Sequence, residues 1–275
     1  MKKSLLIIGG VVILGILVAV VWVLRPSPEA SAPIEAIPLA ASTQGPVSEE
    51  ITPTEAIAYP APTEAISAYP VPGETAVQTN TAYPAPEEAA TETTTSDAVI
   101  FTIVQAESEA RFTLTELLNG NPKTVVGTTD QVAGEIAIDF ANPTNSQLGI
   151  IQVNARTITT DSNNRNRMIQ NEILDTGPYE FITFTATALT GLPATIAVGE
   201  TITFQITGDL TIRDITQQVT FEATATVISL ERLEGLASVT ITREAYSLTI
   251  PSVPQVANIS EEVLVELEFV AVPTE

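Results

Sequence analysis

Hydrophobic and polar residues alternate with a period of two along the last two-thirds of the chain, from residue 98 to residue 275. In the clearest run, from Gln217 to Val227, the residues Val219, Phe221 and Ala223 share one face, and threonine or glutamate residues lie between them. A period of two indicates a β-strand with one buried face, and the β-branched residues that fill these runs favour strands. The pattern therefore predicts a sheet of amphipathic strands.

The same alternation continues in four other runs. Their apolar members are Val132, Ile136, Ile138 and Phe140; Ile182, Phe184, Ala186 and Ala188; Ile202, Phe204 and Ile206; and Val263, Val265, Leu267 and Phe269. Turn-forming residues separate the runs at Asn119-Gly120-Asn121-Pro122, Asn142-Pro143, Gly191-Leu192-Pro193 and Gly208-Asp209. One short helix is expected from Arg165 to Leu174, capped by residues 161–164 and ended by Gly177-Pro178. Because helices do not alternate with the strands, the sequence predicts an all-β antiparallel sandwich or closed barrel with one helical insert.

Small residues on the apolar faces favour a hollow barrel. The inner faces of a sandwich interdigitate and are filled by large side chains, whereas these faces include pairs of alanines such as Ala186 and Ala188. A barrel of about eight strands with small inward residues has room for an elongated apolar ligand. Alanines also occur where a helix or loop packs closely, so this pattern by itself leaves the packed alternative open.

Residues 1–25 have the pattern of a transmembrane signal-anchor. Lys2 and Lys3 precede 21 uncharged residues, Ser4 to Leu24, which as a helix would span roughly 31 Å at about 1.5 Å per residue, close to the thickness of a bilayer core. Positive charges stay on the cytoplasmic side, so we expect a single-pass protein of the cell membrane with its C-terminal part extracytoplasmic. A cleaved signal peptide is the alternative, although its apolar region is normally shorter.

Residues 26–97 predict a disordered, acidic linker rich in Pro, Ala, Thr and Glu. They hold 12 of the 19 prolines and 11 acidic residues, with no basic residue. Proline fixes φ and removes an amide donor, so the segment favours an extended polyproline II tether. A Tyr-Pro motif recurs at residues 58–62, 68–72 and 82–86, and the alternative role of these repeats is docking to an aromatic groove on a partner.

Composition narrows the classes of function. The formal net charge is −22, and the chain has neither histidine nor cysteine, which excludes disulfides, thiolate or imidazole metal ligands, and nucleophile pairs that need histidine. So acidic a chain repels a phosphate backbone, and we expect no nucleic-acid partner. Neither a Gly-rich phosphate loop nor a Gly-x-Ser-x-Gly elbow occurs. We therefore expect no enzymatic activity, no cofactor and no metal.

Several segments of residues 98–275 match, in order, the motifs of a known family. The most specific is Gly208-Asp209-Leu210-Thr211-Ile212, and others are Val125-Val126-Gly127, residues 132–139 and residues 154–184. With these motifs the sequence resembles the YceI-like family of lipocalin-like, polyisoprenoid-binding proteins. The resemblance implies an antiparallel barrel whose apolar lumen holds a long isoprenoid chain or a similar amphiphile. The sequence departs from the family at Asn166, Glu180 and Asp214, where Asp, Pro and Gly are usual.

Two sets of residues are candidates for binding a ligand. The first consists of apolar residues on the inward faces, predicted to line the lumen: Phe112, Leu114, Ile136, Ile138, Phe184, Phe204, Ile206, Phe221, Val265 and Leu267. The second consists of Arg156, Arg165 and Arg167, which could meet an anionic or phenolic head group. Their alternative role is pairing with the abundant carboxylates, worth less than about 1 kcal/mol for each exposed pair. Gly208-Asp209 is interpreted as a turn or bulge.

The sequence thus predicts a membrane-tethered, extracytoplasmic binding protein with three parts: an anchor (1–25), a disordered linker (26–97) and a lipid-binding β-barrel (98–275). The expected partners are an isoprenoid-type lipid in the lumen and the membrane at the N-terminal helix, and formation of a homodimer is left open. The alternative function is a structural or adhesive β-module with a packed core and no ligand, because the strand pattern is compatible with both.

Overall fold

The computed structural model describes residues 28–31, 33–39 and 98–274. The predicted membrane anchor, the Tyr-Pro repeats and most of the predicted linker lie outside the described residues. Among the residues that are described, no helix is long and apolar enough to cross a membrane.

Thirteen strands form one antiparallel sheet in the described part of the chain. Their bounds are β1 (Val99–Ile103), β2 (Glu109–Leu118), β3 (Asn121–Thr129), β4 (Val132–Ala133), β5 (Glu135–Ile138), β6 (Gln147–Leu148), β7 (Ile151–Asn154), β8 (Phe181–Thr190), β9 (Thr201–Ile212), β10 (Ile215–Ser229), β11 (Arg232–Thr242), β12 (Val256–Ala257) and β13 (Glu262–Pro273). Between β7 and β8, the helix α3 (Asn163–Met168) continues into a π-helical turn, η4 (Ile169–Ile173). Short 3-10 turns are η1 (Gln105–Glu107), η2 (Pro143–Asn145), η3 (Ala155–Thr157) and η5 (Glu244–Tyr246).

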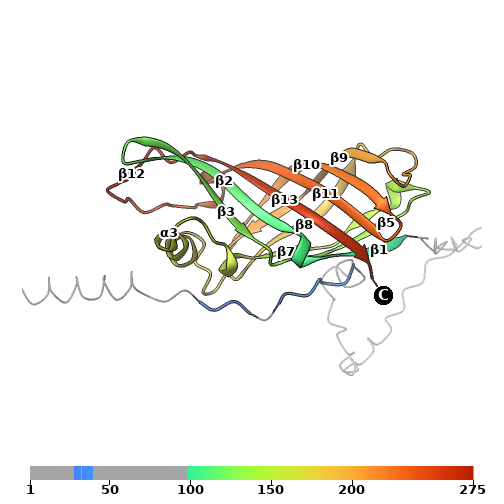
Figure 1. Ribbon diagram of the computed structural model, residues 1–275, viewed down its shortest axis with the longest axis horizontal. Coiled ribbons are helices and arrows are strands. Elements are labelled where there is room, and N and C mark those ends of the chain that lie inside the picture. The colour runs from blue at the N-terminus through green and yellow to red at the C-terminus, as the bar shows by residue number, and fades with distance from the viewer. Residues whose placement is uncertain (1–27, 32, 40–97, 275) are drawn as a thin grey trace, which may run out of the picture. The chain divides into compact units, whose positions relative to one another are not determined.

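The sheet curls around its own interior (Figure 1). Strands β7, β8, β9, β10, β11 and β13 follow one another as antiparallel neighbours, and β13 then pairs with β2 along one half of its length and with β1 along the other. On the opposite side β7 pairs with β4, and the Gly134 carbonyl next to β4 accepts a 3.0 Å hydrogen bond from the Ile103 amide at the end of β1. The predicted all-β antiparallel class with one short helix is confirmed, in the form of a curled sheet or half-barrel.

Alternation along the long strands decides which side chains face the interior. On β10, Phe221, Ala223 and Val227 are buried, whereas the residues between them are mostly exposed. The rings of Phe184 and Phe221 meet edge to face inside the sheet, 5.0 Å between centroids, a geometry that the quadrupoles of aromatic rings favour. The period of two in the sequence therefore located the inner face correctly on this strand.

Of the two interpretations of Gly208-Asp209, the turn is wrong: strand β9 runs through both residues, and the turn comes later, at Arg213, which has a positive φ of 59°. A bulge does lie at this place, but in the facing strand, where the register of β8 shifts opposite Gly208 and Thr207. Glycine is required at 208 for close packing: a Cβ there would lie 2.4 Å from the Thr185 carbonyl oxygen and 2.8 Å from the Ala186 Cα. The glycine thus marks a close approach of backbones.

A β-bulge in β8 corrects one further expectation. The register of β8 against β9 shifts between Ala186 and Ala188, and an extra residue of this kind reverses which face the following side chains occupy. Ala188, predicted to face inward, is exposed. Leu189 lines the interior in its place.

Residues 28–31 and 33–39 run along the sheet (blue in Figure 1). Within this segment Ile34 and Leu39 are buried, with 9% and 7% of their surface exposed. The sequence pattern did not indicate this contact, because a run rich in proline and glutamate resembles a solvated linker.

Candidate ligand-binding site

The interior of the curled sheet contains two adjoining cavities. The larger, of about 560 Å³, lies between β2, β3, α3 and the segment 248–259. The smaller, of about 160 Å³, extends toward β5, β6 and the loop 191–200. The two adjoin because five apolar residues line both: Ala110, Val153, Ile182, Leu210 and Val265. These five residues therefore form the apolar boundary where the two cavities meet.

All ten residues predicted to line the lumen line these cavities. Phe112 and Leu114 line the larger cavity, Val265 lines both, and the smaller cavity is lined by Ile136, Ile138, Phe184, Phe204, Ile206, Phe221 and Leu267. In the smaller cavity the only polar residues of the described lining are Ser146, Gln147, Thr183 and Glu266. The arrangement is suited to hydrocarbon, and lipid binding by these residues stays a prediction.

Glycines opposite aromatic residues shape the walls of this space. Phe112 on β2 pairs directly across the ladder with Gly127 on β3, and a Cβ at 127 would come within 2.2 Å of the Phe112 ring. Gly235 and Phe269 form a second pair of this kind on β11 and β13, where a Cβ at 235 would lie 2.5 Å from the Phe269 ring. In each pair the ring covers the exposed backbone of the glycine, so the large aromatic side chain does not occupy the middle of the cavity.

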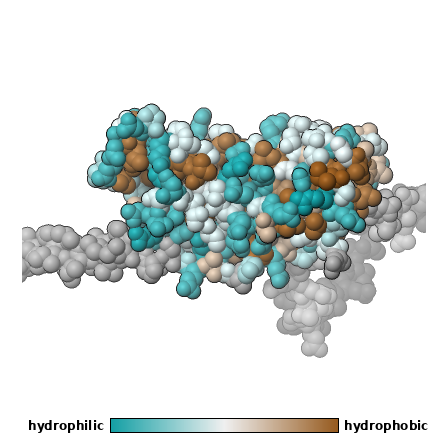
Figure 2. Space-filling view, viewed as in Figure 1, coloured by the Kyte–Doolittle hydropathy of each residue, from teal (hydrophilic) through white to brown (hydrophobic). Residues whose placement is uncertain are grey.

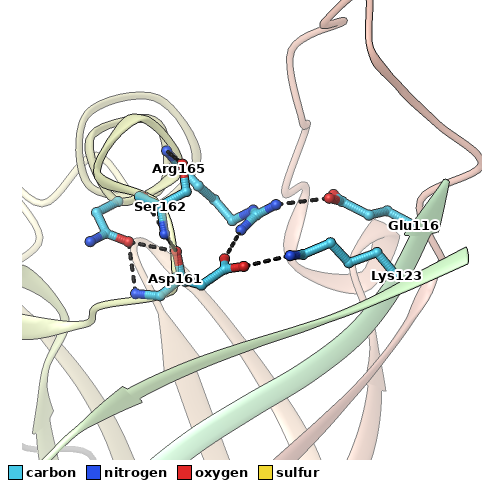
Figure 3. A network of polar contacts seen from close by, with 7 residues as sticks. Glu116, Lys123, Asp161, Ser162 and Arg165 are labelled. Carbon is cyan, nitrogen blue, oxygen red and sulfur yellow. Dashed lines mark hydrogen bonds and ion pairs between the residues drawn. The ribbon is translucent and has the colours of Figure 1, made fainter. Parts of the chain in front are cut away.

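A cluster of charged residues, here called the mouth cluster, lies in the wall of the larger cavity beside α3: Glu116, Lys123, Asp161 and Arg165 (Figure 3). Arg165 donates from Nη2 to the Glu116 carboxylate at 2.8 Å and also bonds Asp161 through Nη1. Glu116 is buried, with 6% of its side chain exposed. Lys123 donates to the second oxygen of Asp161, and this bond together with the charge of Arg165 lowers the pKa of Asp161. Two cations therefore balance two carboxylates.

The cap of the helix beside the mouth cluster lies within the predicted residues 161–164, and the helix begins at Asn163, two residues before the predicted start. The Ser162 hydroxyl caps α3 by accepting a hydrogen bond from the Arg165 amide, at 3.5 Å, because the first amides of a helix have no partner within it. The cap fixes the first turn and thereby directs the Arg165 side chain toward the cavity wall (Figure 3).

The structure does not bring the three candidate arginines together. Arg165 lines the larger cavity, but Arg156 lies outside the cavity lining and pairs with Glu180 at 2.8 Å. Arg167 is exposed and donates to the Asn164 side chain at 2.6 Å. Of the three predicted head-group candidates, only Arg165 is therefore placed where it could meet a ligand, and it is already paired.

Sequence reasoning missed most of the polar wall. Glu116 lies on the same inward face of β2 as Phe112 and Leu114. A charged residue at such a position in the alternating pattern indicates a polar site in the interior. Lys123 and Asp161 had no comparable signal. The segment 248–259, which contributes Leu248, Ile250 and Val253 to the larger cavity, was also missed because it has no strand periodicity.

The outer surface is mixed in character. Figure 2 shows hydrophilic and apolar residues interspersed over the face in view, with a concentrated apolar patch near the end where β5, β9 and β10 lie. In the part of the chain that the structure describes, no cluster of three or more acidic, histidine or cysteine side chains is arranged as a metal site.

A curled antiparallel sheet around two adjoining cavities is typical of a lipocalin-like fold. The chain belongs to the YceI-like family, because residues 101–271 match the YceI-like domain. No curated protein matches the chain in sequence.

The solved structures to which this chain is similar include the following three. A polyisoprenoid binding domain from Saccharophagus degradans, implicated in plant cell wall breakdown, is 16% identical with a TM-score of 0.51, over 64% of this chain and 99% of that one. BcnA from Burkholderia cenocepacia is 17% identical with a TM-score of 0.49, over 61% and 98%. The YceI protein of Campylobacter jejuni is 16% identical with a TM-score of 0.45, over 54% and 84%. At such identities the likeness concerns the fold alone.

Proposed function

We propose that this protein holds a polyisoprenoid or a similar long apolar lipid inside its curled sheet, as a binding protein tethered to the membrane on its extracytoplasmic side. The observation that carries the proposal is the pair of adjoining apolar cavities. The polyisoprenoid-binding description of the Saccharophagus degradans domain supports the same class of ligand.

The volume of the interior argues for a ligand. Protein interiors are packed as densely as organic crystals and contain few voids larger than a water molecule, whereas the larger cavity alone measures about 560 Å³. Sites for small molecules typically measure about 300–1,000 Å³. A structural or adhesive module with a packed core gains nothing from such a space, since empty volume forfeits dispersion contacts. This difference favours the carrier over the packed alternative.

Binding requires no reaction. Removing apolar surface from water contributes about 25 cal/mol per Å², so a hydrocarbon tail is stabilised in proportion to the length that enters the cavities. The mouth cluster is balanced in charge, and it lies where a polar head group would remain once the tail is inside. Tail length is then limited by the depth of the smaller cavity.

The tether is inferred from the sequence. An uncleaved helix in residues 1–25 would keep the binding domain close to the bilayer that supplies the lipid, which raises the effective concentration of each for the other. A cleaved signal peptide would abolish this advantage but not the binding itself.

Mass spectrometry of the full chain, extracted from membranes in mild detergent, tests the proposal. Ala223, 2% exposed, lines the smaller cavity, so Ala223→Leu shortens the apolar space. Ala188, exposed on β8, provides the matched control Ala188→Leu. We expect wild type and control to carry the same lipids, and Ala223→Leu to carry shorter ones. A wild-type protein that carries no lipid after extraction would refute the carrier function.

A further inference from the structure

The described residues 28–31 and 33–39, here called the strap, are bound to the outside of the sheet by specific polar contacts at the beginning of this segment. The Ser31 amide and hydroxyl each donate to one oxygen of the Glu180 carboxylate, both at 2.7 Å. The carbonyl of Glu29 accepts a 3.0 Å hydrogen bond from Nη1 of Arg156. Glu180 and Arg156 both belong to the domain 98–275, so these contacts join parts of the chain about 130 to 150 positions apart.

The side chains of Arg156 and Glu180 are held in place by contacts that do not involve the strap. Arg156 pairs with Glu180 at 2.8 Å and also donates to the carbonyls of Thr176 and Gly177, each at 2.8 Å. Asn154, 1% exposed, donates to Glu180 at 3.0 Å. Because these bonds fix both side chains before any peptide arrives, the strap meets a site that is already organised, which lowers the entropic cost of docking.

Apolar anchors follow along the strap. Ile34 and Leu39 are buried, whereas the intervening Glu35 and Pro38 are exposed. The Ile34 carbonyl accepts a hydrogen bond from the Gln105 side chain, and the Leu39 amide donates to Glu135 at 2.8 Å. The strap thus has one face toward the sheet and one toward solvent, as a bound peptide has.

The strap begins at the end of the sheet that contains the larger cavity. Arg156 lies in η3, and its carbonyl accepts a 2.8 Å hydrogen bond from Gln170 in the helical insert. Ile158, two positions after Arg156, and Ile169, next to Gln170, both line the larger cavity. The contact between Glu29 and Arg156 therefore holds the beginning of the strap beside the helical wall of that cavity.

We propose that the strap is a built-in docking segment that holds the sheet with its larger cavity next to the membrane. From Arg25, the end of the predicted anchor, to Pro28 the chain reaches at most about 11 Å. The distance of the domain from the bilayer is then set by the docked strap, and the length of residues 40–97 does not determine it. Docking rests on the described contacts alone, whereas the orientation toward a membrane rests on the proposed anchor.

Cross-linking of the full chain tests docking. A Cβ built at Gly149 lies 3.5 Å from the Leu39 Cγ, close to the separation that a disulfide requires between a Cβ and the opposite sulfur. The chain has no other cysteine, so Leu39→Cys with Gly149→Cys gives a single defined bridge. We expect it to form about tenfold or more faster than a bridge between Leu39→Cys and Ala188→Cys, since docking raises the effective concentration.

A variant that undocks the strap completes this test. Ile34→Asp places a charge at a buried anchor, so adding it to the Leu39→Cys, Gly149→Cys chain should slow bridge formation to the rate of the control pair. Equal rates for the test pair and the control pair in the otherwise unchanged chain would overturn docking.

Energy transfer to a labelled lipid tests orientation. A dye on Asn163→Cys marks α3, at the end with the larger cavity, and a dye on Val198→Cys marks the opposite end, where the neighbouring Gly199 amide bonds Val227 at 2.7 Å. The two positions differ by about 30 to 40 Å along the strands, at about 3.3 Å per residue with the usual tilt. In vesicles containing a fluorescent acceptor lipid, we expect stronger transfer from position 163, and loss of the difference with Ile34→Asp.

The outcomes separate the proposals. Rapid bridging with equal transfer from both dyes would leave docking standing and overturn the orientation. Rapid bridging in a protein that does not associate with vesicles would refute the proposed anchor, and with it the orientation, but not docking. Absence of preferential bridging would refute the strap while the lipid-binding function remained a separate question for mass spectrometry.

Discussion

Removing Arg165 should leave a buried carboxylate without a partner. Glu116 has 6% of its side chain exposed and Arg165 has 18%, and their hydrogen-bonded atoms are 2.8 Å apart. Breaking a buried ion pair by removing one member costs about 3–5 kcal/mol. We expect Arg165→Met to cost about 3 kcal/mol, near the lower limit, because the pair lies at a cavity and keeps some exposure. The second bond of Arg165, to the exposed Asp161, adds less than about 0.5 kcal/mol.

The double variant distinguishes an unpaired charge from lost packing. Replacing both members by apolar residues, Glu116→Leu with Arg165→Met, removes the buried charge, so its stability should lie within about 1 kcal/mol of wild type. Arg167→Met on the same helix is the matched control, since Arg167 is exposed and bonds only Asn164 among the described contacts. Its effect should not exceed about 0.5 kcal/mol.

Unfolding in urea, followed by circular dichroism, provides the measurement. A loss of about 3 kcal/mol lowers the melting temperature of a domain of this size by about 6–12 °C, and the slope of the unfolding free energy against urea should stay constant. The reasoning is refuted if Arg165→Met is no less stable than Arg167→Met, or if the double variant is as unstable as the single one.

Two further predictions follow from the packing of β9 and from the strap. Gly208→Ala should destabilise the fold by about 1–3 kcal/mol, because its Cβ would meet backbone atoms at 2.4 and 2.8 Å. The control is Gly177→Ala, whose nearest contact is 4.0 Å away and which should change the free energy of unfolding in urea by less than about 0.5 kcal/mol. Similar losses of stability in both variants would contradict the close approach of the backbones at Gly208. Burial raises the pKa of Glu180, but hydrogen bonds from Ser31 and Asn154 and the charge of Arg156 outweigh it and leave the pKa below its usual value of 4.5. Docking of the strap should therefore be complete above about pH 4.5 and weaken as the pH falls through the lowered pKa of Glu180. The measurement is hydrogen exchange at the Ser31 amide, which should lose its protection in acid. Glu180→Gln should remove this pH dependence, and protection of the Ser31 amide that persists in acid would contradict the prediction.

The inward faces of the long strands could be predicted because strand geometry is local. Successive side chains point to opposite sides of a strand, so the face on which a residue such as Phe204 or Phe221 lies can be inferred from the alternation of its nearest neighbours in the sequence. The same holds for the cap of α3 at Ser162, which is a short-range signal, whereas the helical insert ends at Ile173, four residues before the predicted stop at Gly177. Where a bulge interrupts the ladder, as before Ala188, the local rule fails because the partner strand decides the register.

The all-β class of the fold, its helical insert and the apolar character of the inward faces could be predicted from the amino-acid pattern alone, since each depends on neighbours two to four positions away. Which polar groups contact one another depends on the tertiary structure. Arg165 pairs with Glu116, 49 positions away, and Ser31 donates to Glu180, 149 positions away, and no periodicity specifies such contacts. They arise because curling of the sheet brings distant segments together, and a buried charge such as that of Glu116 then requires a partner.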